Sequence, residues 1–203
     1  MRLVFASIAL VAAAPLIAAP AVQDMPGSHD VSAVEGGSYE VDGNHSYVTW
    51  TVNHMGFTPL TGQIGGTSGT LMLDPANPEA AQVDVTFDLT AISHPVDAFL
   101  RHLKSDDFFA VEQHPTARFV STEVDVNGTQ ATITGNLTIK GITRPVTLEA
   151  EFFGAGVNPM SEKRNIGFTG TTTINRSDFG LGYATPVVSD EVKLAIDAAF
   201  VKS

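Results

Sequence analysis

The stretch ATITGNLTIKGITRPVTLEAEF, residues 131–152, decides the fold. Apolar or small residues occupy every second position, and the alternation resumes after a turn-like segment at 140–145. The residues of the apolar face are Ala131, Ile133, Gly135, Leu137, Ile139, Val146, Leu148, Ala150 and Phe152. This period is typical of half-buried β-strands. Because the connection is short, the two strands are expected to pair antiparallel.

The same period continues on both sides of this stretch, from residue 38 onward. Asn127-Gly128 is a hairpin signal, and Phe119 lies on the opposite strand face from Val120, Val124 and Val126. With no intervening helix-length patterns between most strands, eight or nine antiparallel strands predict an all-β closed barrel or a sandwich. The other alternating sets are Val48, Trp50 and Val52; Val83, Val85, Phe87 and Leu89; Ile166, Phe168, Gly170, Thr172 and Ile174; and Val192, Leu194, Ile196, Ala198 and Phe200.

One segment departs from this period. Val96, Phe99, Leu100 and Leu103 are spaced as on one face of a helix, and Pro95 precedes them. A short helix at about 96–104 is therefore expected near one end of the barrel. It is either a plug that completes the core or a lid beside a cavity mouth.

Composition narrows the function classes. The 203 residues hold 11 Lys and Arg against 22 Asp and Glu, a net charge of −11, and no Cys. The absence of Cys excludes disulfides, thiolate metal sites and Cys nucleophiles. The acidic balance disfavours nucleic acid as a partner and electrostatic docking on anionic membranes.

The N-terminus has the pattern of an export signal. Arg2 precedes an apolar run from Leu3 to Ala19, and Ala19-Pro20-Ala21 resembles a cleavage site. Residues 1–21 are thus expected to be a signal peptide, with a membrane anchor as the alternative. A protein exported without Cys favours a periplasmic location. Residues 22–37 are rich in Gly, Pro, Asp and Ser, and we expect a flexible lead-in before a domain at 38–203.

Several ordered segments together resemble the YceI-like family, which is described as periplasmic, lipocalin-like, polyisoprenoid-binding barrels. They cover about residues 38–203. The matching segments are HSYV at 45–48, VNHMG at 52–56, HLKSDDFF at 102–109, HPTARFVST at 114–122, GNLTIKGIT at 135–143 and NRSDFG at 175–180, followed by VSDEV at 188–192. The resemblance implies a lipocalin-like eight-stranded barrel. One departure is that Phe99 and Leu100 stand where the family often has Arg-Asp, so no role of that charged pair carries over.

The resemblance also implies a ligand, an isoprenoid lipid such as a quinone or its precursor, held in the barrel without any further cofactor. Small residues on the inward face would leave volume for it: Gly135, Ala131, Ala150, Gly170, Thr172 and Ala198. From the residues alone, a dry interdigitated core is the favoured alternative. The residues expected to line the tunnel and its mouth are Trp50, His54, Phe57, Phe87, Phe99, Leu100, Leu103, Phe108, Phe119, Gly135, Leu137, Phe152, Phe168 and Phe179.

Polar candidates are few. His54 is in phase with Trp50 and Val52, and it either bonds a ligand head group or is a buried His satisfied by a carbonyl. Arg176 in the 175–180 corner is expected to stabilise a bend by bonding carbonyls or Asp178. The histidines form no H-x-H or H-E-x-x-H motif, so no metal site is expected.

No catalytic motif is present: there is no G-x-S-x-G elbow and no phosphate-binding Gly-rich loop. Catalysis is therefore unsupported, and the barrel pattern, the small inward residues and the family resemblance together imply a lipid carrier without stable membrane insertion, as a monomer or homodimer. Two alternatives stay open. One is a hydrolase or isomerase acting on a lipid in the same cavity, and the other is an interaction module with a packed core.

Overall fold

The alternating residues 131–152 form two neighbouring strands, as their period predicts. β9 (Gln130–Ile139) and β10 (Ile142–Val157) pair antiparallel, with Ile139 opposite Ile142 and Ala131 opposite Ala150. The protein is represented by a computed structural model that describes residues 25–203. The expected signal peptide at 1–21 lies outside the described residues.

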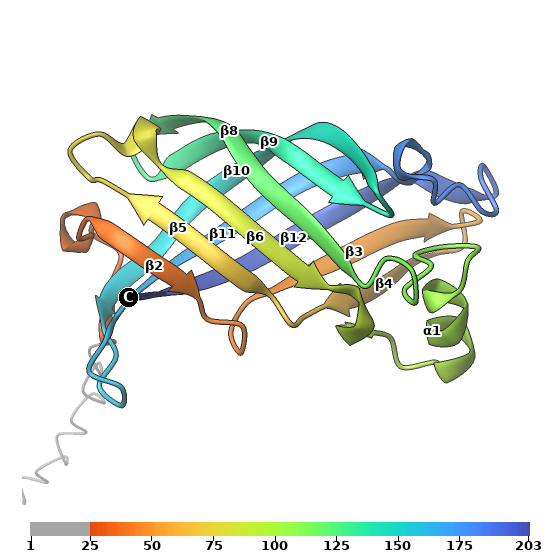
Figure 1. Ribbon diagram of the computed structural model, residues 1–203, viewed down its shortest axis with the longest axis horizontal. Helices are drawn as coiled ribbons and strands as arrows, with labels where there is room; N and C mark the ends of the chain where they lie inside the picture. The colour runs from red at the N-terminus through yellow and green to blue at the C-terminus, as the bar shows by residue number, and fades with distance from the viewer. Residues whose placement is uncertain (1–24) are drawn as a thin grey trace, which may run out of the picture.

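The strands close into an eight-stranded barrel, although the first three wall strands are each broken in two (Figure 1). The first wall strand consists of β2 and β3, which both pair with β12. The second consists of β5, which pairs with β2, and β4, which pairs with β3. The third consists of β6, which pairs with β5, and β7, which pairs with β4. Three interrupted strands and the continuous β8 to β12 give eight. Because β12 returns to the first strand, the sheet is a barrel and not a sandwich, and the eight-stranded prediction is confirmed.

A side chain bridges the first break, between β2 and β3. The Ser46 hydroxyl accepts a hydrogen bond from the Ala199 N–H (2.9 Å) and donates to the Ala199 carbonyl (3.1 Å). Ser46 is buried, and Thr67 donates to its carbonyl from the second break. The hydroxyl thus satisfies backbone groups of β12 where the ladder is interrupted.

The elements follow one another with short connections. Their bounds are β1 Gly27–Ser28, η1 Val31–Ala33, β2 Gly37–Val41, β3 Tyr47–His54, β4 Thr58–Ile64, β5 Ser68–Leu73, η2 Pro78–Ala80, β6 Gln82–Asp88, η3 Leu89–Ala91, β7 Ile92–Ser93, α1 Asp97–Lys104, β8 Thr116–Asn127, β9, β10, β11 Arg164–Asn175, η4 Arg176–Phe179 and β12 Val188–Lys202.

A β-bulge in β8 changes the strand's phase. The register with β9 shifts between Ser121 and Glu123. Phe119 and Val124 are therefore both buried toward the interior, although simple alternation places them on opposite faces.

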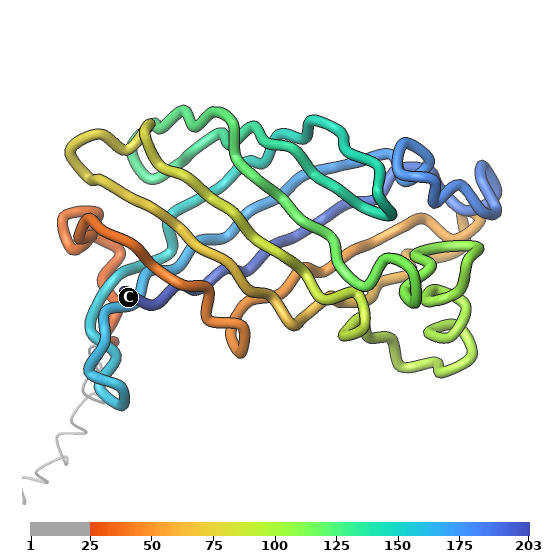
Figure 2. Tube along the Cα trace, viewed as in Figure 1, coloured from red at the N-terminus to blue at the C-terminus, as the bar shows by residue number. Residues whose placement is uncertain are grey.

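The two ends of the barrel are built differently (Figure 2). At one end lie α1, the β3–β4 turn at 55–57 and the loop at 180–187, which we call the α1 end. The expected helix at 96–104 is confirmed, with bounds Asp97–Lys104. The chain's described N-terminal residues and its C-terminus lie at the other end.

The expectation of a flexible lead-in at 22–37 is wrong for its described part. Residues 25–36, which we call the strap, include β1, which pairs with β10, and η1. The Glu35 carboxylate contacts Arg164 (2.5 Å) and Lys202 (2.8 Å), and its carbonyl accepts from the Tyr39 hydroxyl (2.6 Å). Composition alone missed this because most partners of the strap, β10, Arg164 and Lys202, lie more than a hundred residues away in the chain.

Candidate functional site

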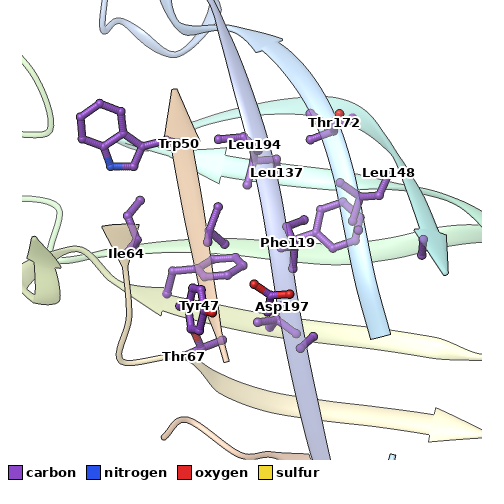
Figure 3. A pocket seen from close by; sticks show the side chains of 18 of the residues that line it. Tyr47, Trp50, Ile64, Thr67, Phe119, Leu137, Leu148, Thr172, Leu194 and Asp197 are labelled. Atoms are coloured by element: carbon purple, nitrogen blue, oxygen red, sulfur yellow. The ribbon is translucent and has the colours of Figure 1, made fainter. Parts of the chain in front are cut away.

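A cavity of about 720 Å³ runs inside the barrel from the strap end to the α1 end. Its lining is overwhelmingly apolar and comes from every wall strand, and Figure 3 shows part of it, with Trp50, Phe119, Leu137, Leu148 and Leu194 among the labelled side chains. A volume of this size is typical of sites that hold a small molecule rather than of packing defects. The barrel interior is therefore not a dry, fully interdigitated core.

Ten of the fourteen residues expected in the tunnel line this cavity. They are Trp50, His54, Phe87, Phe99, Leu103, Phe108, Phe119, Leu137, Phe152 and Phe168. Five of the six small inward residues line it too, namely Ala131, Ala150, Gly170, Thr172 and Ala198. Small side chains at these positions leave space between the large ones.

Of the other four expected residues, three lie at the α1 end but outside the cavity lining. Phe57 is 86% exposed on the β3–β4 turn, and Leu100 packs against the buried cluster beneath α1. Phe179 is 1% exposed and belongs to the core beside Ile139 and Val146. Each is at the α1 end, but their side chains do not face the cavity.

Gly135 requires the clearest correction. A Cβ built on it would lie under 3.0 Å from the Phe119 ring and from the Val120 carbonyl oxygen. The space above Gly135 is therefore occupied by Phe119 and is not available to a ligand. The interdigitated arrangement, which the sequence left as the alternative, holds at this position.

Several lining residues were not predicted from any sequence pattern. Val31 and Val34 of the strap close one end, together with Pro75 and Pro78 of the β5–β6 connection. Tyr183 and Ala184 contribute from the loop at the α1 end. All six lie outside the long strands, where no period identifies an inward face, and only their position in space brings them to the cavity.

The His and Arg side chains of the lining lie at the α1 end: His54, His102 and Arg176. His102 Nε2 lies 2.9 Å from Asp107 Oδ2, and its ring meets Phe108 and Tyr183 edge-on at 5.0 Å each. These contacts join α1 to the loop at 180–187. The α1 end of this mostly apolar cavity thus offers imidazole and guanidinium groups to a ligand, whereas Asp197 and Gln130 line the cavity elsewhere.

Arg176 holds that loop in place, as the sequence predicts for a bend-stabilising Arg. Its guanidinium is buried and donates to the carbonyls of Leu181, Tyr183 (2.7 Å), Val188 (3.0 Å) and Ser189 (2.8 Å). Burial lowers the pKa of Arg176, and the nearby Asp190 carboxylate acts in the opposite direction by raising it. Asp190, not Asp178, is the neighbouring acid, and its own pKa is lowered chiefly by a hydrogen bond from the Ser177 hydroxyl.

Trp50 forms the floor under α1. Its indole ring covers Gly62, where a Cβ would collide with it, and lies 6.4 Å from the Phe99 ring and 6.5 Å from the His94 ring. Its Nε1–H is enclosed by the protein and has no hydrogen-bond partner among the described residues. Trp50 is also the chain's single Trp, which makes it a natural optical reporter for the cavity.

Within residues 25–203, no group of three or more His, Asp and Glu side chains is placed to hold a metal ion. No helix in that part of the chain is long and apolar enough to cross a membrane.

Comparison with known proteins matches this architecture to one family. The YceI-like domain matches residues 39–200. The chain belongs to the YceI-like family. A UPF0312 protein of Pseudomonas aeruginosa is 36% identical over 166 residues, covering 81% of this chain and 86% of that protein.

Two solved structures share the barrel of this YceI-like protein. Burkholderia cenocepacia BcnA superposes with a TM-score of 0.70 at 26% identity, covering 78% of this chain and 98% of BcnA. A polyisoprenoid binding domain from Saccharophagus degradans, implicated in plant cell wall breakdown, superposes with a TM-score of 0.62 at 13% identity, covering 81% and 98%. At that identity the second match shows the fold alone.

Two of the YceI-like segments quoted from the sequence lie at the α1 end. HLKSDDFF supplies the last turn of α1 and the residues after it, and NRSDFG forms η4. Phe99 lines the cavity against His94, with ring centroids 4.7 Å apart, and the partly buried Leu100 packs against the cluster beneath α1.

Proposed function

We propose that this YceI-like protein binds a long apolar or amphiphilic isoprenoid lipid in its barrel and carries it through the periplasm. The observation that carries the proposal is the continuous apolar cavity of about 720 Å³, which links the strap end to the α1 end. An elongated cavity suits a chain-like ligand. The name of the Saccharophagus degradans domain, which has the same fold, agrees with such a ligand.

The energetics favour an apolar chain. Burial contributes about 25 cal/mol per Å², so about 400 Å² of buried chain would contribute about 10 kcal/mol before the cost of association. A polar head fits best at the α1 end, because His54, His102 and Arg176 line the cavity there. An isoprenoid quinone or its precursor has both features, an apolar tail and a compact head with acceptor oxygens.

Binding explains the site better than catalysis. His102 is paired with Asp107, and the hydrogen bonds of Arg176 go to the carbonyls that fix its loop. These roles position structure around the cavity rather than a nucleophile beside a base. The periplasmic part of the proposal rests on the signal-like residues 1–21.

The decisive experiment is native mass spectrometry of the protein purified from a bacterial periplasm without detergent. A discrete added mass that extracts as a prenyl chain is the expected result, and it would also name the ligand. An apo mass that persists after incubation with quinones and prenyl phosphates would overturn the proposal. Recovery of a chemically altered lipid would indicate turnover instead.

A further inference from the structure

The barrel wall has an incomplete seam between β10 and β11. These strands pair from Val157 opposite Arg164 to Glu149 opposite Thr171, and their ladder stops there. Beyond that point, residues 142–148 of β10 stay paired with β9, and residues 172–175 of β11 stay paired with β12. The two strands therefore separate from each other over the half of the seam nearest the α1 end.

Side chains fill the wide end of this gap. Phe179 is packed beside Ile139 and Val146, and the Ile142 side chain lies against Gly180. Arg176 fixes the loop that follows Phe179 through its carbonyl contacts. The buried Phe179 thus replaces the missing strand pairing at the rim of the barrel.

Between this plug and the end of the ladder, one hydrogen bond crosses the seam. The Thr172 hydroxyl donates to the Thr147 carbonyl at 2.7 Å. A single hydroxyl contact resists separation less than a run of backbone pairs, because each ladder pair must be broken together with its neighbours. This section is therefore easier to open than the seam on its strap side.

The wall at this point is also thin. Thr172 and Leu194 line the inner cavity, and they also line a hollow on the outer surface. The rest of that hollow is formed mainly by outward-facing threonines of β3, β10 and β11, with Lys193 of β12. Thr172 and Leu194 thus border both the inside of the barrel and its outer surface.

We propose that the seam between residues 142–148 of β10 and 172–175 of β11 is a lateral portal for the ligand's apolar chain. The proposal rests on the lipid-binding function above. Opening requires loss of the Thr172–Thr147 bond while the pairings of β10 with β9 and of β11 with β12 remain. A chain could then slide sideways into the cavity without leaving by its ends, where the strap is tied down and α1 covers the mouth.

The chain's lack of Cys permits a direct test by stapling the seam. The double variant Thr147→Cys/Thr173→Cys places a cysteine on each side of the gap, two residues beyond the last paired residues of β10 and β11. Both positions are exposed. Glu149→Cys with Thr171→Cys is the matched control, since these exposed residues are already partners in the ladder. Intact mass verifies each disulfide, and a short bismaleimide replaces the disulfide if the wider pair does not oxidise.

Each protein is loaded with an isoprenoid quinone, and release to excess phosphatidylcholine vesicles is followed by recovery of Trp50 fluorescence. The cross-link across the gap is expected to slow release at least tenfold. Where the cross-link is a disulfide, its reduction should restore the rate of the unlinked protein. The control staple should leave release within twofold. Thr172→Val, which removes the bridging bond, should speed release several-fold.

Equal rates for the two stapled proteins would overturn the portal and indicate exit past α1. This failure differs from failure of the proposed function, because equilibrium loading of the unstapled protein is measured first. No quinone or prenyl lipid bound at that stage would overturn both.

Discussion

The Phe119 ring of β8 lies over the backbone of Gly135 on the neighbouring strand β9. The two residues are diagonal neighbours, since Phe119 is opposite Leu137 and Ser121 is opposite Gly135. The arrangement places a large aromatic in the wall without strain, because Gly135 has no Cβ to meet it. On β3 and β4 the Trp50 ring likewise covers Gly62, here its directly opposite partner. In both pairs the glycine makes room for a ring of the protein itself.

Gly135→Ala should therefore destabilise the fold rather than only alter the cavity. Overpacking against Phe119 and the Val120 carbonyl is expected to cost about 1–3 kcal/mol in the free energy of unfolding. Gly65→Ala is the control, because nothing lies near a Cβ at that position, and its change should stay within about 0.5 kcal/mol. Urea denaturation measures both. If the double variant Gly135→Ala/Phe119→Leu loses less free energy of unfolding than the sum of the two single variants, the contact is confirmed. Additive losses would contradict it.

Phe87→Glu should abolish lipid uptake with less effect on folding. Phe87 is half-buried and lines the cavity, so a carboxylate there opposes entry of an apolar chain. We expect at least a tenfold loss of affinity in a quinone titration followed by Trp50 fluorescence. Phe153→Glu is the matched control, because Phe153 projects outward from β10 and is 61% exposed. Equal affinities for the two variants would count against an apolar cavity site.

Arg176→Lys should lower the free energy of unfolding markedly, although the substitution keeps the positive charge. A lysine cannot reach four carbonyls in the geometry of a guanidinium, and it leaves buried acceptors unpaired. The expected loss is about 3 kcal/mol, from hydrogen bonds to a charged group. Arg144→Lys, on an exposed Arg that bonds only the adjacent Thr143 carbonyl, should be close to neutral. Thermal denaturation compares them, and similar midpoints would refute the anchoring role.

The strap should loosen in acid. The pKa of Glu35 is lowered, first by the hydrogen bond from Lys202 and further by Arg164 and Lys202 charge. A carboxyl with a depressed folded-state pKa stabilises the fold above its ordinary pKa, near 4.5, and this stabilisation is lost as pH falls through the lowered value. Amide hydrogen exchange of β1 should rise over that range, after correction for intrinsic rates. Glu35→Gln should lack this step, and a step of the same size in the variant would assign it to another group.

The sequence by itself determined the antiparallel strands and the helix, whereas the choice between a barrel and a sandwich was decided by the pairing of β12 with the first wall strand. Alternation is a local property, so β9, β10, β11 and β12 show their inward faces directly, and the helical spacing around Leu103 identifies α1. Burial on one face forces a period of two on any strand, whatever its partners. Most of the cavity lining could be predicted for the same reason.

Only the tertiary structure decided what each inward position does. The period shows that Gly135 and Gly170 face inward, but the register between strands places Phe119 over the first and leaves the second open to the cavity. The bulge in β8, the strap's ion pairs and the split seam likewise depend on contacts between distant segments. Such contacts are set by shape and register across the whole barrel, and no local pattern encodes them.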